Sequence, residues 1–198
     1  MKKTIYRMTV NAVLVALMIS LSLHANRDHA TGGDANVRSG NLGRPAPDRV
    51  LTDSELKEIL TLCDLLVDRR QDQFKRERAA WRLGMEFAHK HAIQSLVAVL
   101  RDRSDQVDVR QRCVLALSWT ADKRIVDFLI DAVNDREINV AGQALDQLNK
   151  LTGFYWPGEL GPDPTTEPWR RRQERWRKWW EEHREDAVLR WDEATSFR

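Results

Sequence analysis

The sequence has little of what several specialised classes of protein require. Its two cysteines allow at most one disulfide bond, which excludes a disulfide-stabilised scaffold. Its 32 basic and 30 acidic residues leave a formal net charge of +2, so the chain lacks the basic excess of a general nucleic-acid binder. It contains no P-loop, no G-x-G-x-x-G and no G-x-S-x-G motif, which are common signatures of nucleotide binding and of hydrolase nucleophiles. Composition and motifs therefore indicate no catalytic class.

The first 25 residues differ in charge from the rest of the chain. They carry Lys2, Lys3 and Arg7 without any acidic residue, whereas the remainder holds 29 basic and 30 acidic residues. Their apolar run, residues 12–23, is shorter than the roughly 20 residues that cross a bilayer. Residues 1–25 are therefore predicted to be a secretory signal peptide that directs the chain to the periplasm or cell envelope. An uncleaved N-terminal anchor is the alternative.

A disordered linker is predicted for residues 26–51. Residues 26–50 hold four glycines, two prolines and almost no large apolar side chain. Such a segment cannot bury enough surface to offset the entropy of ordering it. It is either a flexible tether that holds the folded part away from a membrane or simply a disordered terminus.

What the chain does contain is an internal repeat with a period near 33 residues. The segments KRERAAWRLG (75–84), VRQRCVLALS (109–118) and VAGQALDQLN (140–149) align, with Leu83, Leu117 and Leu148 at one position. Small residues such as Gly84 and Ala116 recur where helices would approach closely. This period is typical of stacked helical repeats, so we expect an all-α superhelix over residues 52–156. The expected repeat helices are 73–88, 92–101, 107–120, 123–134 and 138–151.

Two and a half repeats leave apolar sides that only further helices can cover, so both ends of the stack should be capped. The N-terminal cap is predicted over residues 52–69, which begin with the capping-box pattern Thr52-x-x-Glu55. Its apolar stripe consists of Leu56, Leu60, Cys63, Val67 and Phe74, widened by Ile59 and Leu66. Cys63 and Cys113 occupy apolar positions of helices in different layers, so they are predicted to be buried free thiols.

The repeats resemble HEAT repeats of the short bacterial type that also occurs in phycobilisome-lyase-like proteins. The resemblance covers residues 75–151 and rests on an Asp after the second helix and a Val-Arg pair that opens the next first helix. Asp102 with Val109-Arg110 matches this pattern, whereas Asp135 is followed by Val140-Ala141. The resemblance implies a HEAT-repeat solenoid whose Asp–Arg ladder is interrupted at the third unit. It implies little about activity, because a fold does not fix a function.

Residues 157–198 are predicted to form a Pro/Gly-rich loop and a C-terminal capping helix. Gly153 should end the last repeat helix, and the new helix should run over residues 167–191. At 100° per residue, one side of this helix carries Trp169, Trp176, Trp180, Ala187 and Trp191. That side is expected to seal the last repeat. Alternatively, Trp179 with Arg175 and Lys178 forms a contact surface for a partner or an anionic membrane surface.

A second candidate surface lies on the second helices of the repeats. Asp127 and Asp131 are four residues apart on a polar side, and Gln94 aligns with Asp127. Second helices of HEAT repeats usually line the groove that faces a ligand, so these three residues are the best candidate strip; a solvated face is the alternative. The His89-x-His91 and Glu86-x-x-His89 pairs lack the partners that a metal site needs. No catalytic, metal-binding or cofactor-binding residue is therefore predicted.

The leading functional hypothesis is a non-enzymatic, exported scaffold that presents a helical surface to a protein partner. The alternative is a lyase-like accessory protein related to the HEAT proteins that handle bilins. A nucleic-acid binder like the HEAT-like alkylpurine DNA glycosylases is disfavoured by predicted export and by the balanced charge. Contact with a membrane is expected only if the N-terminal segment stays uncleaved.

Overall fold

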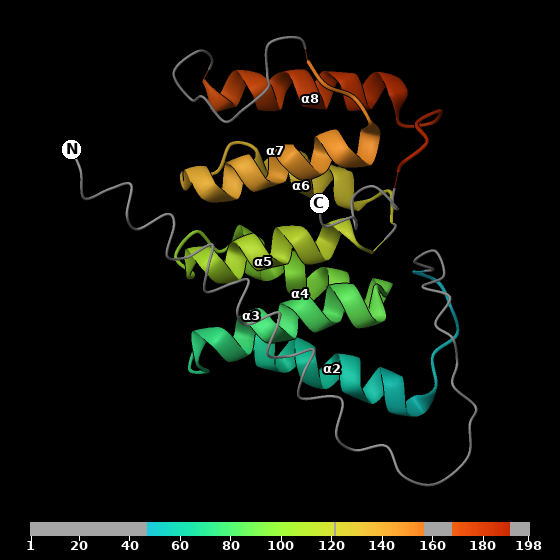
Figure 1. Ribbon diagram of the computed structural model, residues 1–198, viewed down its shortest axis with the longest axis vertical. Coiled ribbons are helices and arrows are strands. Elements are labelled where there is room, and N and C mark those ends of the chain that lie inside the picture. Colours follow the sequence, from blue (N-terminus) through green and yellow to red (C-terminus); the bar gives the residue numbers. More distant parts are fainter. Residues whose placement is uncertain (1–46, 121, 157–167, 191–198) are drawn as a thin grey trace, which may run out of the picture. The chain divides into compact units, whose positions relative to one another are not determined.

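The computed structural model describes residues 47–120, 122–156 and 168–190, and every regular element in them is a helix (Figure 1). The elements are α2 (Asp53–Val67), α3 (Gln73–Arg82), the π-helical turn η1 (Leu83–Phe87), α4 (Lys90–Arg101), α5 (Val107–Ser118), α6 (Ile125–Ala132), α7 (Ile138–Thr152) and α8 (Trp169–His183). The predicted all-α superhelix is confirmed, and the repeat helices begin and end within two residues of the predicted positions. The predicted signal peptide and residues 26–46 of the predicted linker lie outside the described residues.

The helices form two layers that share one hydrophobic core. The first helices α3, α5 and α7 pack side by side in one layer, and α2, α4, α6 and α8 follow one another in the other (Figure 1). Leu83, Leu117 and Leu148 are fully buried in the same core, as the repeat alignment predicts. The turn η1 approaches α5 so closely that a Cβ at Gly84 would lie 2.6 Å from the Ala116 Cα. The small residues therefore set the spacing between successive first helices.

Two buried ion pairs connect successive repeats. The Arg76 guanidinium donates to both carboxylate oxygens of Asp105, at 2.7 and 2.5 Å, and to the Leu66 carbonyl at the end of α2. Arg110, one repeat later, bonds in the same way to Asp135 and to the Leu100 carbonyl at the end of α4. Each arginine therefore joins the end of one second helix to the loop that precedes the next first helix. Bidentate pairing of this kind satisfies charges that would be costly to bury alone.

The assignment of Asp102 to this ladder was wrong. Asp102 is half-buried and lies 3.4 Å from the exposed Arg69, whereas Asp105 is the residue that pairs with Arg76. The spacing misleads because Asp102 caps the end of α4, and its carboxylate bonds to Ser104 in the following turn. Ala141 stands where Arg76 and Arg110 stand in the first two repeats, so the ladder has two rungs among the described residues.

The predicted buried stripe of the N-terminal helix was also partly wrong. Helix α2 begins at Thr52 with the predicted capping box, and it packs on α3 and α4. Leu60 and Phe74, however, are 50% and 63% exposed, and Phe74 belongs to α3. The buried side consists of Ile59, Leu62, Cys63 and Leu66. Two neighbouring helices, rather than the widest apolar stripe, decide which side of α2 is covered.

Residues 47–51, which the sequence assigned to the linker, contact the helical stack. The Lys90 amide donates to the Pro47 carbonyl at 3.2 Å, and the Lys90 ammonium lies 2.8 Å from Asp48. Arg49 pairs with Glu55 at 3.0 Å, and Leu51 packs against the core. Bonds from the Thr52 amide and Arg49 lower the pKa of Glu55 to about 2. The prediction failed here because the contacts are made chiefly by the backbone and by charged side chains, which an apolar pattern does not reveal.

The C-terminal helix caps the stack but is shorter than expected. Trp176 and Trp180 are buried in the core, which agrees with the predicted seal. Gly153 ends α7 with a φ of 64°, as predicted. The helix α8 ends at His183 instead of reaching residue 191, because the chain turns back and the Arg190 amide donates to the Leu151 carbonyl at 2.6 Å. Ala187 is therefore half-buried outside the helix, and Trp191 lies beyond the described residues.

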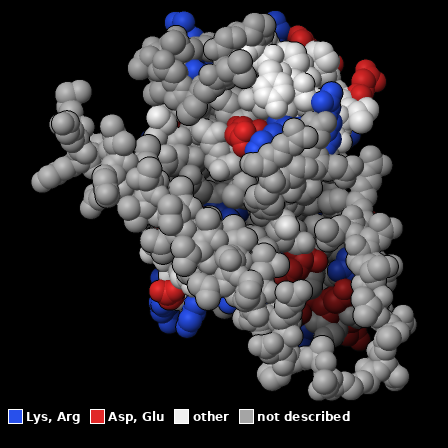
Figure 2. Space-filling model, viewed as in Figure 1, with Lys and Arg blue, Asp and Glu red and all other residues white. Residues whose placement is uncertain are grey.

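Both cysteines are buried free thiols, as predicted. Burial raises the pKa of Cys63 and, more strongly, that of Cys113, so both stay protonated at neutral pH. Across the described residues, the structure offers no helix with the length and apolar character needed to span a bilayer. Figure 2 shows charges of both signs in small groups on one face, in keeping with the balanced composition.

Candidate functional site

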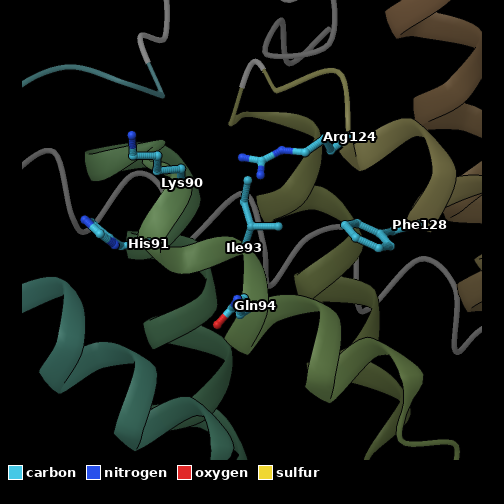
Figure 3. A pocket seen from close by; sticks show the side chains of 6 residues that line it. All are labelled: Lys90, His91, Ile93, Gln94, Arg124 and Phe128. Carbon is cyan, nitrogen blue, oxygen red and sulfur yellow. The ribbon is translucent and has the colours of Figure 1, made fainter. Parts of the chain in front are cut away.

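A cleft of ≈ 330 Å³ opens between the N-terminal ends of α4 and α6 (Figure 3). Its lining residues are Lys90, His91, Ile93 and Gln94 from α4 and Arg124 and Phe128 beside and on α6. Figure 3 shows the Arg124 side chain extending from α6 toward α4, with Ile93 between the two helices. The cleft thus combines two cationic head groups, an amide that can donate and accept, and two apolar side chains.

The α4 side of the cleft is fixed by His89. Its Nδ1 accepts from the His91 amide at 3.3 Å, which caps the helix, and its Nε2 lies 3.1 Å from the Arg49 carbonyl. Because one nitrogen accepts, the network assigns the proton to Nε2, which donates to Arg49. Burial, with the nearby charges of Arg49 and Lys90, lowers the pKa of His89 despite the bond to Arg49. His89 is therefore a neutral cap that also holds residues 47–49 against the helix.

The α6 side of the cleft is fixed by Asp122. Its carboxylate accepts from the Arg124 amide at 2.9 Å and from the Arg124 guanidinium at 2.5 to 3.1 Å. These bonds, chiefly those from the side chain, lower the pKa of Asp122. The pair orients Arg124, which still leaves 70% of its side chain exposed. A partner could therefore reach the guanidinium without displacing it from Asp122.

The structure separates the three residues of the predicted strip. Gln94 is exposed and lines the cleft. Asp127 pairs with Arg184 at 3.3 Å, and Asp131 pairs with Arg101 at 3.1 Å and with Arg177 at 2.6 Å. Both carboxylates are half-exposed, and they tie α8 to α6 and α4. Asp127 and Asp131 therefore serve intramolecular contacts, and Gln94 is the member of the strip that lies at an open site.

The three candidates on α8 are also used differently. Trp179 is half-buried, with Phe154 stacked at 5.1 Å and His183 at 4.8 Å between ring centroids. The Arg175 guanidinium lies 4.7 Å from the centre of the Trp156 ring. Lys178 is exposed and lies 4.0 Å from Glu182 on the same helix. Trp179 and Arg175 thus take part in the packing of α8, and Lys178 has the most accessible side chain of the three.

Sequence reasoning missed Lys90, Arg124 and Phe128. A signal was present in the repeat alignment, because Lys90-His91 and Lys123-Arg124 occupy equivalent positions at the start of the two second helices. The acidic and aromatic patterns that mark the predicted site residues do not extend to these basic positions. In the parts of the chain that the structure describes, no three His, Cys, Asp or Glu side chains gather as metal ligands would.

Comparison with known proteins agrees with this architecture. A family model for HEAT repeats matches residues 59–149, from the middle of α2 to near the end of α7. No curated protein and no solved structure matches the chain. The stretch that resembles HEAT repeats is the one whose helices pack in two layers.

Proposed function

We propose that this chain is a non-enzymatic HEAT-repeat scaffold, exported from the cytoplasm, that binds another protein through the cleft between α4 and α6. The observation that carries the proposal is the exposure of Gln94, Arg124 and Lys90 around an open cleft on a rigid repeat stack. Aromatic and arginine side chains are enriched at protein interfaces, and the cleft supplies Phe128 and Arg124. The HEAT-repeat match supports the proposal, because such repeats commonly serve as surfaces for protein partners.

The lyase-like alternative receives less support. A role in handling a pigment would need a reactive group beside a pocket, and the two thiols are buried and protonated. Neither Cys63 nor Cys113 lines the cleft. Incubation of the full chain with bilin followed by mass analysis tests this alternative, and an adduct or a colour change would favour it over the scaffold.

The experiment that tests the scaffold is crosslinking and pull-down of the tagged full chain from the exported fraction of its own cells. The Gln94→Lys/Arg124→Glu variant alters the cleft without changing a buried residue. A Lys57→Gln variant, which removes one exposed positive charge on α2 and so changes the net charge equally, is the matched control. We expect a partner that is captured by the wild type and by the control and is lost from the cleft variant. Equal capture by all three proteins would refute binding at the cleft, and absence of the chain from the exported fraction would refute export.

A further inference from the structure

A second exposed surface lies on the outer side of α3 and η1. Phe74, Arg78, Trp81 and Met85 follow the spacing i, i+4, i+7 and i+11, which places them on one side of the helix. Phe74 is 63% exposed, and Trp81 and Met85 are each 37% exposed. The opposite side, with Arg76, Ala79, Ala80 and Leu83, is the one that packs in the core. We call these four outward residues the α3 outer face.

The fold does not require apolar residues at these positions in every repeat: α5 and its C-cap have Leu115 and the buried Trp119 at the positions of Trp81 and Met85, whereas α7 has none. The equivalent positions on α7, two repeats later, hold only polar residues: Asn139, Gln143, Asp146 and Lys150. Lys150 there pairs with Asp146 at 2.8 Å, as expected for a side that faces water. Repeats at the end of a solenoid usually present polar outer sides, because exposed apolar ones reduce solubility. The parts of Phe74, Trp81 and Met85 that stay exposed are therefore not covered by any described residue.

The charges around this face indicate what could cover it. Lys75 is exposed beside Phe74, and neither Lys75 nor Arg78 forms an ion pair with any described acidic residue. Arg82, by contrast, is neutralised by Glu58 at 2.5 Å and Glu86 at 2.7 Å. In a second copy related by a two-fold axis through the centre of this face, Arg78 would lie near its own counterpart, and like charges oppose such contact. The occupant should instead be anionic.

The cationic surface around the α3 outer face is narrow, which favours a helix over a membrane as its occupant. Glu77 flanks the α3 outer face on one side and Glu86 flanks it on the other. A broad anionic lipid surface would meet both of these carboxylates, and membrane-surface helices usually surround their apolar side with Lys and Arg instead. A single helix is narrow enough to contact the apolar row and the two cations alone.

We propose that the α3 outer face is a docking site, separate from the cleft, for an acidic amphipathic helix of another protein. The apolar side of that helix packs on Phe74, Trp81 and Met85, and its flanking carboxylates pair with Lys75 and Arg78. Trp and Arg are the residues that most often dominate binding energy at interfaces, and here they are neighbours on one face. The chain then has two faces for partners, which is what a scaffold that joins two proteins needs. The proposal does not rest on binding at the cleft.

The test uses the full chain with the photo-crosslinking residue p-benzoylphenylalanine at position 74, at position 139 as the equivalent site on α7, or at position 94 in the cleft. After irradiation in the chain's own cells, adducts are isolated and the crosslinked peptide is identified by mass spectrometry. We expect an adduct from position 74 and none from position 139, with the crosslinked peptide showing apolar residues at helical spacing flanked by Asp or Glu. Adding Lys75→Glu/Arg78→Glu to the protein with the crosslinker at position 74 should lower the yield of that adduct about tenfold, because both attractive charges become repulsive. Lys57→Glu/Arg171→Glu, which changes the net charge equally, should leave it unchanged.

Several results would overturn this proposal. They are an adduct with a second copy of the chain, an adduct with lipid, an adduct to a peptide without acidic residues, and a yield that survives the Lys75→Glu/Arg78→Glu change. Absence of any adduct at position 74 would also overturn it. An adduct from position 94 reports on the proposed scaffold function independently, so failure of one proposal is distinguishable from failure of the other. Thermal midpoints equal to that of the wild type confirm that the charge variants are folded.

Discussion

Replacement of Gly84 by alanine should destabilise the protein, although the same change in a helix usually does the opposite. Alanine in place of glycine inside a helix ordinarily stabilises it by about 1 kcal/mol. At Gly84, the added Cβ would lie 2.6 Å from the Ala116 Cα and 2.6 Å from a ring carbon of Trp119. One of these neighbours is backbone and the other is a buried indole, so neither can move aside easily. Overpacking of this kind costs about 1–3 kcal/mol.

The expected net effect of Gly84→Ala, the overpacking cost less the gain in helix propensity, is a loss of up to about 2 kcal/mol in the free energy of unfolding. For a chain of this length, a loss of about 2 kcal/mol corresponds to a midpoint lower by about 4–8 °C. The measurement is denaturant unfolding followed by circular dichroism at 222 nm, with linear extrapolation to water. A double-mutant cycle with Trp119→Phe adds a control, because removal of the indole should reduce the cost of the new Cβ. A Gly84→Ala variant that is more stable than the wild type would show that η1 and α5 are not held at this close distance.

Three further predictions concern the buried charges, the His89 cap and the C-terminal seal. Asp135→Ala should lower the free energy of unfolding by about 3–5 kcal/mol, because it leaves the Arg110 charge buried without its partner. The double variant Arg110→Met/Asp135→Leu removes both charges and should cost less. An equal cost of the two variants in urea unfolding would contradict this reasoning. The pKa of His89 in the folded state lies below its ordinary 6.5, so its stabilising effect is present above about pH 6.5 and is lost as the pH falls toward the folded-state pKa. His89→Asn keeps a cap acceptor and should reduce the loss of stability between pH 7.5 and 5.5. The control His91→Gln should lose as much stability over this range as the wild type. Deletion of residues 158–198 should unfold or aggregate the repeats, because Trp176 and Trp180 are buried in their core; a truncated chain with an unchanged midpoint in calorimetry would exclude a sealing role for α8.

The repeat period was enough to predict the helices because each unit buries the same positions. Leu83, Leu117 and Leu148 face one core, and the helix boundaries follow from them. The details that the period could not predict arise from neighbours outside the repeat. The side of α2 that becomes buried depends on where α3 and α4 lie, and the end of α8 depends on the bond between Arg190 and Leu151. The π-helical turn at Leu83–Phe87 was missed because a π turn has no distinct pattern of apolar residues.

The candidate site was harder to predict than the fold. Gln94 was found because its position repeats at Asp127, yet the same helix position faces an open cleft in one repeat and an arginine of α8 in the other. Accessibility at equivalent positions differs because Arg184, just beyond α8, pairs with Asp127, whereas Gln94 borders the open cleft between α4 and α6. Lys90 and Arg124 come together across two repeats, and a single sequence does not show which basic residues will meet.

The two buried arginines also limit how the stack can be extended. The two ion pairs follow one another along the chain, because the loop that supplies the carboxylate of one pair leads into the helix that supplies the arginine of the next. At Ala141 this succession stops, so a further unit inserted after α7 would bring an aspartate for which the third unit has no cation. The ion-pair ladder thus ends at Ala141, and the last repeat is covered instead by the buried Trp176 and Trp180 of α8.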